Sequence, residues 1–175
     1  MQRKTVHFLF LNIGHLLDHL FVLIFATVAA LALATDPVAG GLGMSYSELI
    51  PYAMPGFVAF GIGAIPAGWI ADKWHRHGMT TIFFIGIGLA SIITGFSVSP
   101  IQIGFGLFVI GLFAAIYHPV GLAMVVQGRA TTGMPMAVNG VFGNLGVAIA
   151  ALLTGIIIDG FGWRAAFILP GIFSL

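Results

Sequence analysis

The sequence contains no cysteine and very few charged side chains. Only 6% of its 175 residues are Asp, Glu, Lys or Arg, against roughly 25% in an average soluble domain. The absence of cysteine excludes a disulfide framework and thiolate chemistry. Six basic and five acidic residues provide neither a basic field for nucleic acid nor a charged tail. We therefore expect no nucleic-acid partner.

Apolar residues take the place of the missing charges. They make up 59% of the chain, and the mean hydropathy is +1.11. The apolar runs are continuous and lack the period-2 alternation of membrane β-strands. Glycine is abundant at 25 residues, as expected where helices approach closely in lipid. These features predict an all-α membrane protein that is surrounded by the lipid bilayer.

Charge-free runs locate the membrane-spanning helices, because a hydrocarbon core of about 30 Å needs roughly 20 apolar residues. Turn signals such as Asp36-Pro37 and Asp159-Gly160 separate the runs. We expect one bundle over residues 1–175 with five complete helices and a truncated sixth, at about 7–34, 48–71, 79–97, 101–127, 135–158 and 165–175. The last run has about eleven residues at about 1.5 Å each, which cross only half of the membrane.

The N-terminus also has some features of a signal peptide. Arg3 and Lys4 precede an apolar run that ends in small residues. That run is about twice the usual length of a signal-peptide core, and polar residues at positions 15, 18 and 19 interrupt it. A membrane-spanning helix fits the run better.

The basic residues predict the orientation of the bundle. One side carries Arg3, Lys4, Lys73, Arg76 and Arg129, and the other side carries only Arg164. Loops rich in Lys and Arg face the cytoplasm. We therefore expect a cytoplasmic N-terminus and a location in the cytoplasmic (inner) membrane.

The first predicted helix carries His15, Asp18 and His19 within its apolar run. Spacings of i, i+3 and i+4 place the three side chains within an arc of about 100° on one face. Ionisable groups at membrane depth are costly and usually face a cavity or a partner. We expect this face to point into the bundle.

Three interpretations of this face remain open. The residues can form a structural cluster that joins helices by hydrogen bonds. A carboxylate beside two imidazoles can also serve as a proton site, since the proton affinity of each group depends on its burial and on its neighbour's charge. His15 and His19 further have the i, i+4 spacing of helical zinc ligands, with His118 as a third ligand. This spacing is a weak signal, and we assign no metal or other cofactor from it.

The fourth predicted helix contains Tyr117-His118-Pro119. Pro119 has no N–H, so it leaves the carbonyl of Ala115 without its helical donor and predicts a kink. Backbone polarity of this kind is tolerated at a cavity wall, where we expect His118 to face Asp18. The alternative is a histidine that bonds to a nearby carbonyl.

Small residues and amides mark the fifth helix. Asn139, Gly143 and Gly146 share one face, while Asn144 lies about 140° from Asn139. Small residues on one face indicate close helix packing, with the amides as interhelical hydrogen bonds or ligand contacts. The second helix is interpreted in the same way, as packed and bent at Pro55, Gly56, Gly61, Gly63, Pro66 and Gly68.

Residues 68–77, Gly-Trp-Ile-Ala-Asp-Lys-Trp-His-Arg-His, resemble the signature between the second and third helices of the major facilitator superfamily, Gly-x-x-x-Asp-(Arg/Lys)-x-Gly-Arg-(Arg/Lys). The matching residues are Gly68, Asp72, Lys73 and Arg76, which the resemblance identifies as a conformational motif. His75 and His77 replace a glycine and a basic residue. A carboxylate at the end of its own helix opposes the helix dipole and needs a cation, for which Arg76 is the nearest candidate.

Shorter motifs resemble the fosmidomycin-resistance type of major facilitator efflux protein. They lie at residues 14–19, 117–119 and 143–146. That type usually reads His-x-x-Asn-Asp, whereas Asp18 here stands one position earlier. It also usually has an acid after His-Pro, where this sequence has Val120. Residues 162–164, Gly-Trp-Arg, resemble the turn before the sixth helix of the superfamily.

The resemblance implies a secondary transporter rather than an enzyme, in which two six-helix halves alternate around a substrate site at mid-membrane. We expect export of a small molecule in exchange for protons, with Asp18 and the three histidines lining the N-terminal side of the cavity. Asn139 and Asn144 are further candidates for proton or substrate binding. The implied partner is the missing C-terminal half or a second copy. The alternatives are a membrane assembly or regulatory module without transport, and an intramembrane metal-binding protein.

Overall fold

The computed structural model describes residues 3–34 and 41–175, and all regular secondary structure in these ranges is helical. Five segments are long and apolar enough to cross a membrane: Thr5–Leu33, Tyr46–Lys73, Arg76–Thr94, Pro100–Val126 and Gly133–Phe161. A shorter helix, α8 (Trp163–Ser174), follows them. The predicted all-α membrane fold is therefore confirmed. The predicted turn at Asp36-Pro37 lies outside the described residues.

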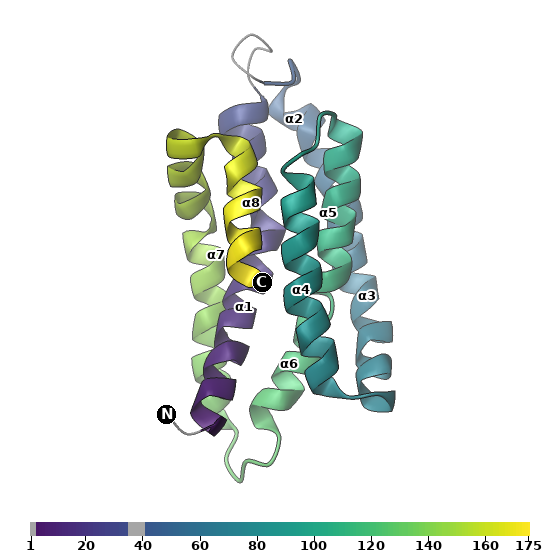
Figure 1. Ribbon diagram of the computed structural model, residues 1–175, viewed down its shortest axis with the longest axis vertical. Helices are drawn as coiled ribbons and strands as arrows, with labels where there is room; N and C mark the ends of the chain where they lie inside the picture. The colour runs from purple at the N-terminus through teal and green to yellow at the C-terminus, as the bar shows by residue number, and fades with distance from the viewer. Residues whose placement is uncertain (1–2, 35–40) are drawn as a thin grey trace.

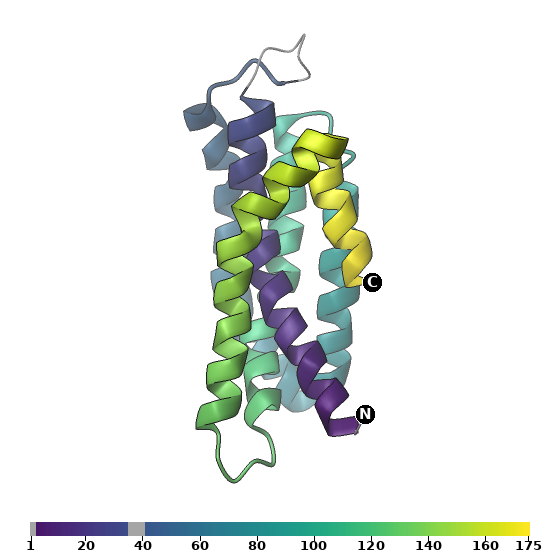
Figure 2. The ribbon, with the colours of Figure 1, turned by 90° about the vertical axis from the view of Figure 1, so that its left-hand side faces the viewer.

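The helices run along the long axis of one elongated bundle (Figure 1). Helix α1 (Arg3–Val28) crosses α7 (Gly133–Phe161) along much of its length, and α3 (Met54–Lys73) lies beside α5 (Pro100–Ala114). The α3–α4 turn and the α6–α7 loop lie at the end where the chain begins (Figure 2). The α4–α5 and α7–α8 connections lie at the opposite end.

Three of the five spans are interrupted. The first ends in a π-helical turn, η1 (Ala29–Leu33). The second begins with α2 (Tyr46–Leu49) and a 3₁₀ turn, η3 (Ile50–Ala53), before α3. Prolines 51 and 55 explain this start, because neither has an N–H to donate to an α-helical bond. In the fourth span, α5 ends at Ala114 and α6 (Tyr117–Val126) begins three residues later, where Pro119 predicts a kink.

Helix α4 (Arg76–Thr94) begins three residues before the predicted start at 79. His75 is the reason, since its Nδ1 accepts a hydrogen bond from the backbone N–H of Gly78 at 2.8 Å and so caps the helix. The backbone of His75 is extended, with φ −158° and ψ 142°. His75 stands where the superfamily signature has a glycine. Because its backbone is extended and not left-handed, a residue with a side chain fits at this position.

Glycines set the closest approaches between helices. A Cβ at Gly111 would overlap the carbonyl oxygen of Gly56, which brings α5 against α3. A Cβ at Gly146 would overlap the carbonyl of Leu16, which brings α7 against α1. The packing interpretation is wrong for Gly61, which is exposed and has no atom within 4 Å of its Cβ position. That glycine faces away from the helices that α3 contacts.

Candidate functional site

Asp18 lies at the centre of a polar cluster between α1 and α6. Its exposed fraction is 0%. Nδ1 of His118, which α6 carries, lies 3.2 Å from its Oδ2 atom. Neither oxygen of Asp18 has a hydrogen-bond partner among residues 3–34 and 41–175. The structure thus places a fully buried carboxylate next to a single imidazole of another helix.

His118 also belongs to a group of three histidines, with His15 and His19 of α1. Their ring centroids are separated by 5.1 Å for 15 and 19, 5.3 Å for 15 and 118, and 5.4 Å for 19 and 118. One ring nitrogen of each lies within 4.8 Å of the other two. His15 is buried, whereas His19 and His118 are half-buried. We call Asp18 and these three residues the histidine cluster.

His15 is held in place from several sides. Its Nδ1 donates a hydrogen bond to the backbone carbonyl of Asn139 on α7 at 2.8 Å. Its ring stacks on Tyr117 with centroids 5.0 Å apart and an interplanar angle of 23°. A Cβ at Gly143 would lie 2.6 Å from its Nε2 atom. Glycine at 143 therefore makes room for the imidazole, so the shared face of the fifth span serves both packing and the site.

A buried hydrogen-bond network joins α1, α6 and α7 next to His15. The Tyr117 hydroxyl donates to the carbonyl of Leu11 at 2.5 Å. The side-chain amide of Asn139 donates to that hydroxyl at 3.0 Å and to Oδ1 of Asn12 at 2.9 Å. Sequence reasoning missed Asn12 and assigned no site role to Tyr117. The position of Asn12, three residues before His15 on the same helix face, was the available signal.

Other predicted residues lie elsewhere. Asn144 is exposed on α7 and does not share the buried face of Asn139. Arg76 donates to Asp72 at 3.0 Å at the end of α3, so the expected counter-ion is present. Lys73 is exposed beside this pair. A Cβ at Gly68 would lie 3.2 Å from Pro119, which makes this motif glycine a contact between α3 and α6.

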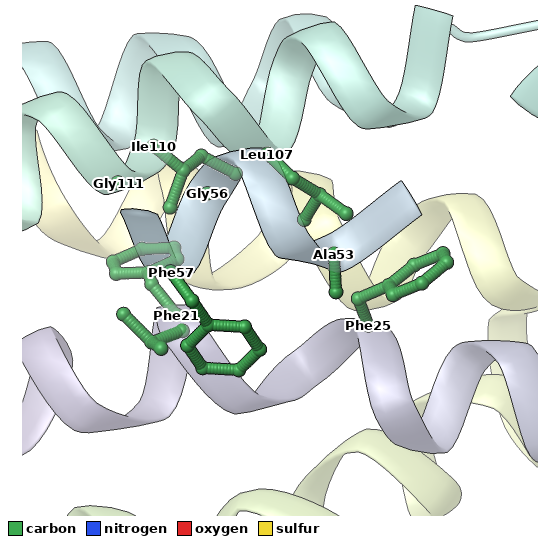
Figure 3. Close-up of a pocket in the computed structure, with 9 residues that line it drawn as sticks. Phe21, Phe25, Ala53, Gly56, Phe57, Leu107, Ile110 and Gly111 are labelled. Atoms are coloured by element: carbon green, nitrogen blue, oxygen red, sulfur yellow. The ribbon is translucent and has the colours of Figure 1, made fainter. Parts of the chain in front are cut away.

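A small apolar cavity lies along α1 beyond the cluster (Figure 3). Its volume is about 20 Å³, and its lining includes Phe21 and Phe25 of α1, Gly56 of α3 and Leu107 of α5. Such a volume holds little more than one water molecule. This cavity is too small for a substrate, and the parts of the cluster that are open to other molecules are His19 and His118, which are half-buried.

The structure is thus a bundle of helices long and apolar enough to cross a membrane, with ionisable residues buried between them. The sequence matches the Major Facilitator Superfamily over residues 13–175, so the chain belongs to that superfamily. The predicted membership of the major facilitator superfamily is thereby confirmed.

Three curated relatives are similar to parts of the chain. The cis,cis-muconate transport protein of Acinetobacter baylyi is 28% identical over 74% of this chain and 32% of its own length. The probable sulfoacetate transporter of Cupriavidus necator is 33% identical over 63% of this chain and 26% of its own length. The puromycin resistance protein of Streptomyces alboniger is 28% identical over 83% of this chain and 29% of its own length. The chain thus spans about a third or less of the relatives it matches.

Proposed function

We propose that the whole protein is a secondary transporter, not an enzyme, that exports a small molecule in exchange for protons. The observation that carries this proposal is the histidine cluster, a fully buried carboxylate beside one imidazole of a group of three in a major facilitator bundle. Carboxylates and imidazoles are the side chains that pumps and transporters use to relay protons through the membrane. The cluster is the N-terminal side of the translocation site.

The position of the cluster fits a site between two moving parts. Asp18 belongs to α1, and its imidazole neighbour belongs to α6. Helix α6 is separated from α5 at Ala115 and Ile116, so its angle can differ from that of the rest of its span. His19 and His118 are partly exposed at the side of the bundle. A C-terminal half, or a second copy of this one, closes the site from that side and completes alternating access.

The relatives support a small-molecule cargo without identifying it. They are named for cis,cis-muconate, sulfoacetate and puromycin, which differ in size and charge. Export rests on the relative named for resistance and on the resemblance to the fosmidomycin-resistance type. Asn139 contacts the cluster through its carbonyl and belongs to the proposed site, whereas Asn144 is exposed away from it.

The cytoplasmic membrane and a cytoplasmic N-terminus are part of the proposal. Lys73 and Arg76 flank the α3–α4 turn, and Arg129 lies in the α6–α7 loop. Both connections lie at the end where the chain begins (Figure 1). Arg164 follows the α7–α8 turn at the other end. This distribution supports a cytoplasmic N-terminus through the positive-inside rule.

The test begins with the reading frame downstream of Leu175, followed by reconstitution of its whole product in vesicles that hold a pH-sensitive dye. A pH gradient is imposed, and cis,cis-muconate, sulfoacetate or puromycin is added. We expect at least one of the three compounds to cause proton movement through the protein, which the dye reports. The same compound should accumulate only while the gradient lasts. A stop codon after Leu175 together with inert vesicles would contradict the proposal and favour an assembly or regulatory module.

A further inference from the structure

The histidine cluster also has the composition of a metal site. We propose that His15, His19 and His118 bind a divalent transition-metal ion of the zinc class, each through one ring nitrogen. These nitrogens lie within 4.8 Å of one another. Zn–N bonds of about 2.0–2.1 Å at tetrahedral angles place the ligand nitrogens about 3.4 Å apart. Binding therefore needs the nitrogens to come closer by up to about 1.4 Å, a side-chain adjustment that the half-buried His19 and His118 can make.

His15 is held in the way that metal-binding histidines are held. In such sites the ring nitrogen that does not bind the ion donates a hydrogen bond to a carbonyl or carboxylate, which fixes the tautomer and the ring orientation. Nδ1 of His15 donates to the carbonyl of Asn139 at 2.8 Å. A carbonyl only accepts, so the proton of the neutral ring lies on Nδ1. Nε2, which lies beside Gly143, then keeps the lone pair that a metal ion needs.

His118 is oriented by a carboxylate instead. Its Nδ1 lies 3.2 Å from Oδ2 of Asp18, which again leaves Nε2 as the free ring nitrogen. Asp18 is fully buried, and within the described part of the chain neither of its oxygens has a hydrogen-bond partner. A buried carboxylate whose oxygens accept no hydrogen bond is costly. A cation held one imidazole away would balance its charge, as in carboxylate–histidine–zinc arrangements.

The ligand set decides the class of ion. Imidazole nitrogens suit zinc, copper, nickel and iron, whereas calcium and magnesium prefer oxygen ligands. Three protein ligands leave the fourth position of a tetrahedral ion for water or for an oxygen of another ligand. Metal binding is measured at equilibrium on purified protein, without vesicles or a pH gradient. A protein that binds no zinc and a protein that does not transport are therefore separate results.

The test is zinc binding by the purified whole product of the reading frame in detergent, with cobalt(II) absorption to report the coordination geometry. We expect one zinc ion per chain and a tetrahedral cobalt spectrum. His15→Ala and His118→Ala should each weaken zinc binding at least about 100-fold, and Asp18→Asn should weaken it about 10- to 100-fold. His19→Gln keeps a polar side chain of similar size at a half-buried position and serves as the ligand variant that preserves folding.

The chain offers a matched control in a second histidine pair. His7 of α1 and His77 of α4 stack with ring centroids 5.1 Å apart, and the described residues supply no third ligand near them. The double variant H7A and H77A should leave zinc affinity within about twofold. An octahedral cobalt spectrum, less than one zinc per ten chains, or affinity that depends on His7 and His77 instead of His19 would overturn the proposal.

Discussion

Two helix pairs of the bundle approach equally closely but differ in polarity. Helices α3 and α5 meet at Gly56 and Gly111, where the backbones touch. Helices α1 and α7 meet at Gly146 and Leu16 in the same way. Between α1 and α7, buried hydrogen bonds also join His15 and Asn12 to Asn139. The contact between α3 and α5 is made instead by backbone and apolar atoms of Gly56, Gly111 and Leu107.

The difference in polarity between these two interfaces shows that close helix packing does not by itself require polar residues. In lipid, small residues alone allow two helices to associate through van der Waals contact, as α3 and α5 do. The polar residues between α1 and α7 are therefore not required for close approach. Each of them needs a partner at membrane depth, and such residues are costly and usually functional. The polar interface is the part of the bundle that we expect to govern transport.

The largest effect on folding should come from adding one methyl group at a glycine contact. Gly111→Ala and Gly146→Ala each place a Cβ against a backbone carbonyl of the neighbouring helix. Backbone cannot move aside as a side chain can, so we expect each change to lower the unfolding free energy by about 1–3 kcal/mol. Thermal unfolding in detergent measures the loss for both interfaces.

Gly61→Ala is the control for these two variants, because its Cβ meets nothing within 4 Å. Alanine favours the helical conformation, so the stability of this variant should stay the same or rise slightly. Equal losses at positions 61, 111 and 146 would contradict the account of close packing at glycine.

The second prediction distinguishes the two interfaces. Asn139→Leu removes the amide that donates to Tyr117 and Asn12 but keeps the backbone carbonyl that orients His15. Hydrogen bonds between membrane helices contribute about 0.6 kcal/mol on average and up to about 1.7. We expect a stability loss of about that size together with a more than tenfold loss of transport by the whole product in vesicles.

Ser91→Ala provides the comparison for Asn139→Leu. Its hydroxyl donates to the carbonyl of Phe167 at 2.7 Å in a buried contact between α4 and α8, away from the cluster. A similar loss of stability with unchanged transport is expected. Equal transport losses in both variants would mean that the Asn139 network supports folding only.

The sequence predicted the fold well because hydrophobic length and turn residues are local signals. The third predicted span began too late because the N-cap at His75 depends on a hydrogen bond of the side chain, which apolar counting ignores. Spacing on one helix placed His15, Asp18 and His19 on one face. The approach of His118 was an expectation based on Pro119, which lies four residues after the carbonyl that it frees, and the structure places Nδ1 of His118 3.2 Å from Asp18.

Other parts of the site could not be predicted from the sequence. The contact between Asn139 and His15 joins residues 124 positions apart, and the crossing of α1 and α7 creates it. Asn139 and Asn144 are equally polar, and only the packing of α7 buries one and exposes the other. The role of Tyr117 likewise depends on Gly14 and Gly121, where added Cβ atoms would overlap its ring.

A smaller effect is expected at the start of α4. His75→Ala removes the side chain that accepts from the N–H of Gly78, which should cost about 1 kcal/mol, as for other N-cap losses. His75→Asn restores an acceptor and should recover most of that stability. Denaturation of the three proteins under one set of conditions measures the difference. Full stability of H75A would show that the cap contributes nothing.

The smallest effect on stability belongs to the superfamily motif at the end of α3. The side chains of Arg76 and Asp72 are 36% and 68% exposed, so their contact should contribute less than about 1 kcal/mol. Arg76→Ala should leave unfolding almost unchanged and slow transport several-fold, because Asp72 then opposes its helix dipole without a cation. Unchanged transport would remove the proposed conformational role of this pair.

The most direct test of the account replaces the buried carboxylate. Asp18→Asn keeps the size of a fully buried side chain and removes its charge, while Asp159→Asn makes the same change at an exposed position of α7. Both variants of the whole product are reconstituted, and substrate movement driven by a pH gradient is measured. The account predicts that D18N yields folded protein without gradient-driven transport and that D159N transports normally. Normal gradient-driven transport by D18N would contradict it.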